Sequence, residues 1–121
     1  MASILDSVKK LLAVPDDYHY FDDVIVMHIN SVFSILVQLG VGPDEGFAIT
    51  GNTETWDDFI PEDSNLEMIK TYVYLKVRLM FDPPTNGSLI EAINRQVSEL
   101  EWRINVQVDP KKKGEDMGVT I

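Results

Sequence analysis

Cysteine is absent from the 121-residue chain, which excludes disulfides, thiolate metal sites and a cysteine nucleophile. Long apolar runs are also missing: no run, residues 24–27 included, comes near the roughly 20 residues that cross a bilayer. Residues 1–6 lack the basic region and long apolar stretch of a signal peptide. We therefore expect one domain, made in the cytoplasm of its cell and without a membrane contact.

Positive charge is scarce and unevenly placed. The net charge is −10, from twenty Asp and Glu against ten Lys and Arg. No Lys or Arg occurs in residues 11–69, a stretch that holds twelve of the twenty acids. A groove that follows a nucleic-acid backbone needs clustered positive charge, so specific DNA binding is not expected. An acidic surface that repels DNA, or that docks on a basic protein, is compatible with this composition.

The first half of the chain predicts two amphipathic helices from apolar residues at three- and four-residue steps. The first helix follows Ser3, a preferred N-cap residue type, and ends at Pro15. The second begins at Asp22 or Asp23 and ends at Gly40, which suits a left-handed C-terminal cap. Apolar side chains cover most sides of this second helix, so we expect it to be central in the fold or covered by a neighbouring chain.

The second half predicts two more helices. The third covers about residues 64–81, and the following Asp82-Pro83-Pro84 stops it. The fourth starts at Ser88-Leu89-Ile90-Glu91, which has the pattern of a capping box. It continues to about Val108, because Pro110 is expected to bar further extension.

The segment between the second and third helices predicts a short β-hairpin. Phe47-Ala48-Ile49 and Glu54-Thr55-Trp56 flank a turn at Gly51-Asn52. A lone hairpin is marginal in water, so this one should lean on the helices or on a neighbouring subunit. The predicted fold class is all-α, with about four helices and a small β-hairpin between the second and third.

The C-terminal residues 109–121 are predicted to form a flexible tail beyond a helical domain of residues 1–108. The basic run Lys111, Lys112 and Lys113 could contact nucleic acid or an acidic protein groove. Two acids follow at residues 115–116, so a solvated tail is the favoured interpretation.

No catalytic or metal-binding constellation is evident. Four acid pairs lie beside predicted helix starts or in loops, where acids are common: Asp16-Asp17, Asp22-Asp23, Asp57-Asp58 and Glu62-Asp63. None has calcium-loop spacing or a histidine that would complete a di-metal site. His28 falls in the apolar arc of the second helix, which favours a packed histidine over a general base. We expect no enzyme, metal or cofactor; a small metal-dependent hydrolase using the Asp pairs with His28 is the weakest alternative.

The fourth helix carries the most informative pattern. Its apolar stripe consists of Ile90, Ile93, Val97, Leu100 and Ile104. Trp102 projects almost opposite this stripe, and Val106 lies close beside it. Tryptophan is enriched at the buried centres of interfaces, so we predict a subunit contact through Trp102 and Val106, together with Phe47, Ile49 and Trp56. Alternatively, the helix is buried on two sides within its own fold, or Trp102 is an incidental surface residue.

Several segments, in this order and spacing, match a known family. They are ILDSVKKLL at 4–12, MHINSVF at 27–33, LGVG at 39–42, TYVYLKVRLMFDPP at 71–84 and SELEWRIN at 98–105. Through them the chain resembles the head–tail connector (adaptor, or head-completion) proteins of long-tailed bacteriophages. The resemblance covers about residues 1–108, and the segment ending in Asp-Pro-Pro is the most telling.

The resemblance implies a virion protein that assembles with itself into a ring, expected to be a dodecamer, beneath the portal of a filled capsid. Such a ring continues the DNA channel without specific DNA binding and seats a tail-side stopper or tail-completion protein. The C-terminal segment of the family reaches toward the portal, which assigns portal binding to Lys111, Lys112, Lys113, Val119 and Ile121. The loop at residues 41–63 is expected to mediate ring contacts.

The acidic composition fits a ring through which a genome must pass, because carboxylates in the lumen repel the DNA backbone. The same composition also fits a protein of another class. A stand-alone acidic interaction module, such as a DNA mimic or an inhibitor, would bind a basic host protein through the loop acids.

Overall fold

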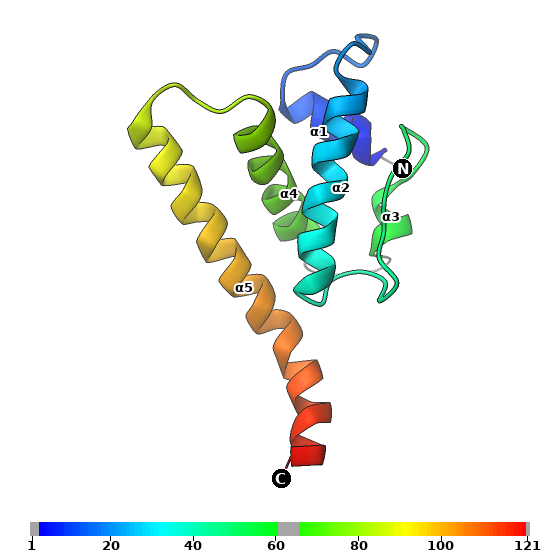
Figure 1. Cartoon of the computed structure of the whole chain (residues 1–121), viewed down its shortest axis with the longest axis vertical. Helices are drawn as coiled ribbons and strands as arrows, with labels where there is room; N and C mark the ends of the chain where they lie inside the picture. The colour runs from blue at the N-terminus through cyan, green and yellow to red at the C-terminus, as the bar shows by residue number, and fades with distance from the viewer. Residues whose placement is uncertain (1–2, 61–65, 121) are drawn as a thin grey trace.

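The computed structural model describes residues 3–60 and 66–120, with side chains through Val106. Within these residues the chain forms helices and no strand, in the order α1 (Ile4–Leu11), α2 (Asp22–Gln38), α3 (Trp56–Phe59), α4 (Leu66–Phe81) and α5 (Gly87–Thr120). The central helix α4 packs against α2 and α5, and α1 contacts both α2 and α4 (Figure 1). The predicted all-α fold class is therefore confirmed.

The start of α1 and the end of α2 follow from local chemistry as predicted, whereas α1 ends at Leu11, before the predicted stop at Pro15. Ser3 caps α1, since its hydroxyl accepts a hydrogen bond from the Asp6 backbone N–H at 3.2 Å. After α2, Gly40 has a φ of 95°, and its N–H donates to the Val37 carbonyl at 3.0 Å. A left-handed glycine with such a bond is a common end of an α-helix.

The start of α5 differs from the prediction. The Asn86 side chain accepts hydrogen bonds from the backbone N–H groups of Ser88 at 2.8 Å and Leu89 at 3.3 Å. Asn86, and not Ser88, is therefore the N-cap, and the helix begins at Gly87, two residues before the position that a Ser88 cap implies. Asparagine caps as well as serine does, and the sequence offers both within three residues.

The end of α5 also differs, because the helix continues through Pro110 to Thr120. The predicted end near Val108 is wrong. An interior proline removes one backbone hydrogen bond and costs about 3 kcal/mol, but a kink is an alternative to a break. The division into a domain of residues 1–108 and a tail of residues 109–121 stays a prediction.

The β-hairpin predicted at residues 47–56 is absent from the described part of the chain. Polar side chains take the backbone groups that a partner strand would have used. Asn30 on α2 accepts from the Ile49 N–H at 2.7 Å and donates to the Ile49 carbonyl at 3.0 Å. The Glu54 carboxylate accepts from the Thr50 N–H at 2.9 Å. The segment is therefore held by side chains, mainly of α2, and needs no strand pairing.

The second half of the predicted hairpin leads into the short helix α3, which begins at Trp56 with Thr55 as its N-cap. The Thr55 N–H donates to the Asp58 carboxylate at 2.9 Å, the reciprocal bond of a capping box. A single antiparallel bridge joins Thr55 to Ser3, and the Ile4 N–H donates to the Glu54 carbonyl at 3.0 Å. These bonds tie α3 to the start of α1.

The segment between α2 and α4 is anchored by aromatic packing on Phe33, a fully buried residue of α2. The Phe33 ring lies 4.4 Å from that of Phe59, 5.5 Å from that of Phe47 and 6.3 Å from that of Trp56, between centroids. Phe33 of α2 thus contacts both the segment that precedes α3, through Phe47, and α3 itself.

Gly42→Ala is expected to lower the free energy of unfolding by about 3 kcal/mol, and Gly46→Ala by only about 1 kcal/mol. Both glycines have left-handed φ values, 88° and 95°. A Cβ on Gly42 would collide with the Phe59 ring, whereas a Cβ on Gly46 meets nothing. Urea unfolding of the two variants measures the difference. Equal losses would show that the contact with Phe59 is not tight.

Candidate assembly surfaces

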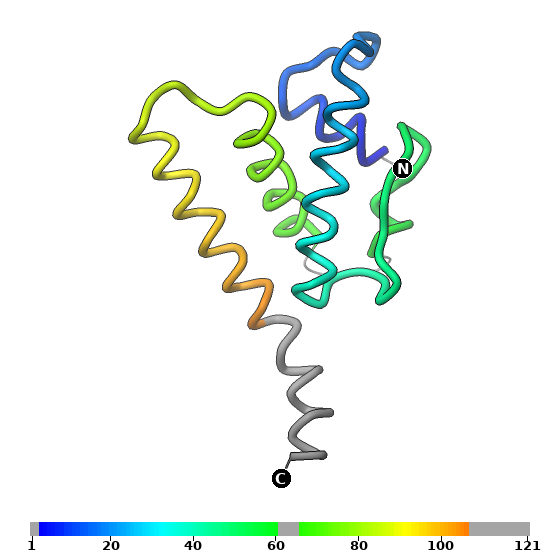
Figure 2. Tube along the Cα trace, viewed as in Figure 1, coloured from blue at the N-terminus to red at the C-terminus, as the bar shows by residue number. Residues whose placement is uncertain are grey.

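The inner side of α5 packs on α4 along the predicted stripe, with Ile93, Val97 and Ile104 buried. Figure 2 shows α5 running beside α4 on the side away from α2. Trp102 lies on the other side of the helix and is 67% exposed, and Val106, one turn later, is exposed as well. Among the residues whose side chains the structure describes, this large indole is left mostly uncovered.

Charged residues of both signs share this side of α5, and the exposed Glu91 lies three turns before Trp102. Arg95, seven residues before Trp102, lies on the same side of α5 and is exposed. On the flank, Arg103 forms an ion pair with Glu99 at 3.0 Å. We call Arg95, Trp102 and Val106 the α5 outer face.

The other residues predicted at a subunit contact have places inside the subunit. Ile49 and Trp56 are buried, and the Trp56 indole N–H donates to the Ser7 hydroxyl at 3.4 Å. Phe47 is partly buried against Phe33. These side chains hold the segment after α2, and their contact with a neighbouring subunit stays a prediction.

The portal-binding role predicted for the C-terminal residues concerns side chains that the structure does not describe. Lys111, Lys112, Lys113 and Val119 lie in the C-terminal part of α5, and Ile121 lies outside the described residues. That role stays a prediction.

A buried lysine organises the connection between α1 and α2. Lys9 is 1% exposed, and its Nζ lies 2.7 Å from Asp22 Oδ1. The same ammonium donates to the backbone carbonyls of Tyr18 at 2.8 Å and Asp16 at 3.3 Å. A buried charge is costly unless such partners surround it. Lys9 therefore fixes the loop between α1 and α2 in place through these three partners.

The acid of this pair is kept ionised by its partners. Burial alone would raise the pKa of Asp22, but hydrogen bonding and charge from Lys9 and His19 outweigh it, and the pKa lies below the ordinary 3.8. The His19 ring nitrogen lies 2.7 Å from the second carboxylate oxygen of Asp22. The sequence did not predict this centre, because Asp22 lies 13 residues after Lys9 and no local pattern pairs the two.

The loop held by Lys9 presents aromatic rings at the surface. The rings of Tyr18, Tyr20 and Phe21 pack together with centroids 5.0 to 6.4 Å apart, and Phe21 also packs on Phe81 at the end of α4. Tyr20 is nonetheless 79% exposed.

The exposed side of α2 continues from this loop. Val24 and Met27, three residues apart and therefore neighbours on the helix, are both exposed, Met27 by 58%. Exposed acids flank the rings and these side chains. We call the whole set the acidic–aromatic surface: Asp16, Asp17, Tyr18, Tyr20, Asp23, Val24 and Met27.

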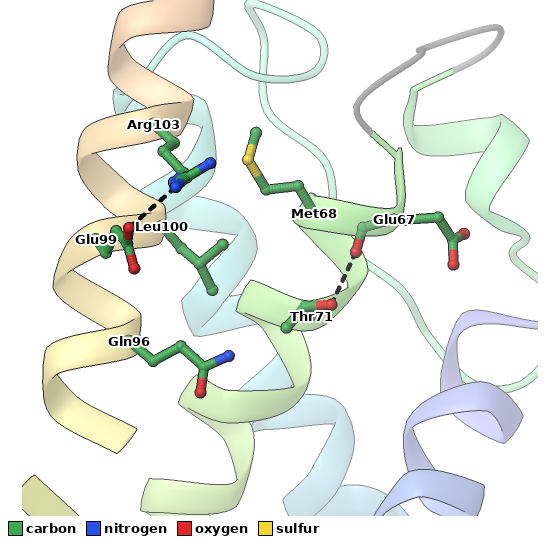
Figure 3. Close-up of a pocket in the computed structure, with 7 residues that line it drawn as sticks. All are labelled: Glu67, Met68, Thr71, Gln96, Glu99, Leu100 and Arg103. Carbon is green, nitrogen blue, oxygen red and sulfur yellow. Dashed lines mark hydrogen bonds and ion pairs between the residues drawn. The ribbon is translucent and has the colours of Figure 1, made fainter. Parts of the chain in front are cut away.

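A shallow groove of about 370 Å³ runs along the surface where α4 and α5 meet (Figure 3). Met68 and Leu100 extend into it, and Glu99 and Arg103 lie on its α5 side. Beside the groove, the Tyr72 hydroxyl donates to the Glu101 carboxylate at 2.7 Å. Burial raises the pKa of Tyr72 far above its usual value, and the bond to Glu101 raises it further. The hydroxyl therefore stays a donor that joins the two helices.

The acids and histidines considered as catalytic or metal-binding candidates do not come together in a site within the described residues. Within residues 3–60 and 66–106, no three His, Asp or Glu side chains are close enough together to hold a metal ion. His28 is partly buried on α2. The pair Glu62-Asp63 lies outside the described residues. Among the described helices, none is both long and apolar enough to span a bilayer.

A protein-family model described as phage connector protein matches residues 4–111 of this chain. No curated protein and no solved structure matches it.

Proposed function

This chain belongs to the phage connector protein family, and we propose that it is the head–tail adaptor subunit of a long-tailed bacteriophage. As a family member it is a structural phage protein. In the proposal, copies form a homo-oligomeric ring below the portal in the virion. The ring, expected to be a dodecamer, continues the DNA channel and seats the tail-side stopper or tail-completion protein. The protein has no catalytic role.

The observation that supports ring assembly is the α5 outer face. Tryptophan is highly buried on average in folded proteins, and tryptophan and arginine are enriched at the energetic centres of interfaces. Trp102, Val106 and Arg95 lie together on one side of α5, opposite the side that packs on α4.

The charge distribution supports the proposed passage of DNA. Residues 11–69 hold twelve acids and no Lys or Arg, so this segment repels phosphates rather than binding them. We propose that part of this acidic surface faces the channel. The C-terminal part of α5, with its three consecutive lysines, is the proposed contact with the portal.

Light scattering of the purified protein across a concentration series, alone and with the portal protein of the same phage, tests the proposal. We expect a ring-sized species in at least one condition. Trp102→Ala should weaken assembly by about 30-fold or more, since a truncated interface tryptophan costs at least about 2 kcal/mol. Leu89→Ala, which truncates an exposed apolar side chain on another side of α5, should assemble normally.

A protein that stays monomeric even with the portal would contradict the adaptor assignment. The acidic segment would then favour the stand-alone interaction module, whose partner would be a basic protein. Circular dichroism of each variant ensures that a loss of assembly is not a loss of folding.

A further inference from the structure

The side of α5 that faces away from α4 carries two rows of exposed side chains with a spacing of seven residues. Seven residues make almost two turns of an α-helix, so the members of each row follow one another along the helix. We call the two rows together the α5 seam: Ser88, Arg95 and Trp102 in one row, and Ala92, Glu99 and Val106, four residues later in each case, in the other. Two adjacent rows of this spacing are the surface through which helices pair in coiled coils.

The α5 seam complements itself when a second α5 runs alongside it in the opposite direction. With the two-fold axis at the level of Val97, a residue that lies a given number of positions after Val97 faces the partner residue that lies as many positions before it. The pairs across the contact, each formed twice, are then Trp102 with Ala92, Arg95 with Glu99, and Ser88 with Val106. The paired stretch, residues 88–106, lies within the part of α5 whose side chains the structure describes.

Both size and charge fit in this register. The indole of Trp102, 67% exposed in the single subunit, lies against Ala92, the smallest side chain of the seam, so a large residue meets a small one. The guanidinium of Arg95 meets the carboxylate of Glu99, and Arg95 forms no ion pair with a described side chain of its own subunit. Covering the indole thus brings opposite charges together near the centre of the contact.

A second copy is the occupant that the charges of this side of α5 select. Arg95 and Arg103 alternate along it with Glu91 and Glu99, so within residues 88–106 it has no net charge that would attract a nucleic acid or a strongly charged protein. A parallel pair in register would place each of these charges on its own copy, and like charges opposed across an interface are disfavoured. Of the two directions, the antiparallel one brings Arg95 opposite Glu99.

We propose that two free subunits pair through the α5 seam in an antiparallel dimer with two-fold symmetry. Such a dimer uses the same surface on both copies, and this surface must be self-complementary. The α5 seam meets that requirement in the sizes and in the charges of its side chains. The pairing itself does not depend on the proposed ring.

Pairing through the α5 seam competes with ring assembly, a consequence that rests on the proposed ring. The two paired subunits point in opposite directions, whereas the subunits of a ring with a head side and a tail side all point the same way. The α5 outer face is part of the seam, so it cannot serve both contacts at once. The dimer therefore withholds Trp102 from the ring contact until the portal recruits the subunit.

Charge reversal tests the pairing in the absence of the portal. Light scattering of the wild type across a concentration series should show a monomer in equilibrium with a dimer. Arg95→Glu and Glu99→Arg should each raise the dissociation constant of the dimer at least about 10-fold, because each places two like-charged pairs near the centre of the contact. Leu89→Ala, on another side of α5, should dimerise as the wild type does.

Combining the two reversals should restore the dimer. In an equal mixture of Arg95→Glu and Glu99→Arg, the two glutamates of one subunit face the two arginines of the other. The double variant likewise recovers opposite charges at each pair, and circular dichroism verifies that every variant is folded. Single reversals that dimerise like the wild type, or a mixture that does not dimerise, would overturn the proposal.

Cysteine cross-linking tests the direction of the two helices, with no background because the chain has no cysteine. Ser88→Cys and Val106→Cys replace residues that face each other in the antiparallel dimer, so a short bismaleimide should link the two variants in an equal mixture. Neither variant should be linked to its own copy, because the two copies of residue 88 lie about 27 Å apart along the helices. A linked dimer from either variant alone, or no link in the mixture, would overturn the antiparallel pairing.

Adding the portal separates this proposal from the adaptor function. A wild type that is monomeric at every concentration without the portal, or that passes directly from monomer to ring, would overturn the pairing and leave the adaptor function standing. A dimer that forms no ring with the portal would contradict the adaptor function and leave the pairing standing.

Discussion

Asp22→Asn is expected to lower the free energy of unfolding by about 3 kcal/mol at neutral pH. The change leaves the Lys9 ammonium buried with only two backbone carbonyls as partners, and an uncompensated buried charge costs about 3–5 kcal/mol. We take the lower end because Asp22 is partly exposed. Urea unfolding monitored by circular dichroism measures the loss.

The effect of Asp22→Asn should depend on pH. The pKa of Asp22 is lowered in the folded state from the ordinary 3.8, so its ionised form stabilises the fold above that unfolded value. That contribution is lost as the pH falls below this value and through the lower folded pKa. Wild type and Asp22→Asn should therefore converge in stability in acid.

Two variants control for other effects. Lys9→Met removes the buried charge and keeps most of the side-chain volume, so it should cost less than Asp22→Asn. The double variant Lys9→Met with Asp22→Asn should be more stable than Asp22→Asn alone. A stability difference that is the same at pH 3 and pH 7 would contradict the role assigned to the ion pair.

Phe33→Ala is expected to lower the free energy of unfolding by about 4 kcal/mol, within the range for a buried phenylalanine. The cavity would open between α2 and the segment after it, because the Phe33 ring packs on Phe47, Trp56 and Phe59. Residues 41–60 should then become more sensitive to proteases than α1 or α4. Chemical unfolding and limited proteolysis provide the two measurements.

Met27→Ala is the matched control for Phe33→Ala. It truncates a large apolar side chain of the same helix that is exposed, so its cost should stay within about 0.5 kcal/mol. Similar losses for the two variants would mean that the rings around Phe33 are loosely packed. Cleavage spread evenly over the chain would show that Phe33 supports the whole fold rather than this segment.

Local chemistry was sufficient for most helix ends. The Ser3 cap, the left-handed Gly40 and the stop at Asp82 each depend on backbone groups within one helical turn, so their signals are visible in the sequence. The buried stripe of α5, and Trp102 opposite it, follow in the same way from the helical period. The Asn86 cap and the Thr55 capping box were also visible, but other patterns nearby competed with them.

The hairpin prediction failed because a strand is completed by a distant partner. Phe47 and Ile49 have the β-propensity of a strand, but the Asn30 side chain, 19 residues before Ile49, takes the backbone groups of that segment. Beta propensity depends on such context more than helix propensity does.

The sequence by itself determined that this protein is helical, acidic in its first half and equipped with a tryptophan on the outer side of its last helix. Family membership also followed from the order of its segments. Only the tertiary structure decided that Lys9 is buried, that the loop it holds presents Tyr20, and that this loop continues into Val24 and Met27 on α2. The physical reason is that periodicity places residues on the face of one helix, whereas burial and ion pairing depend on which helices come together.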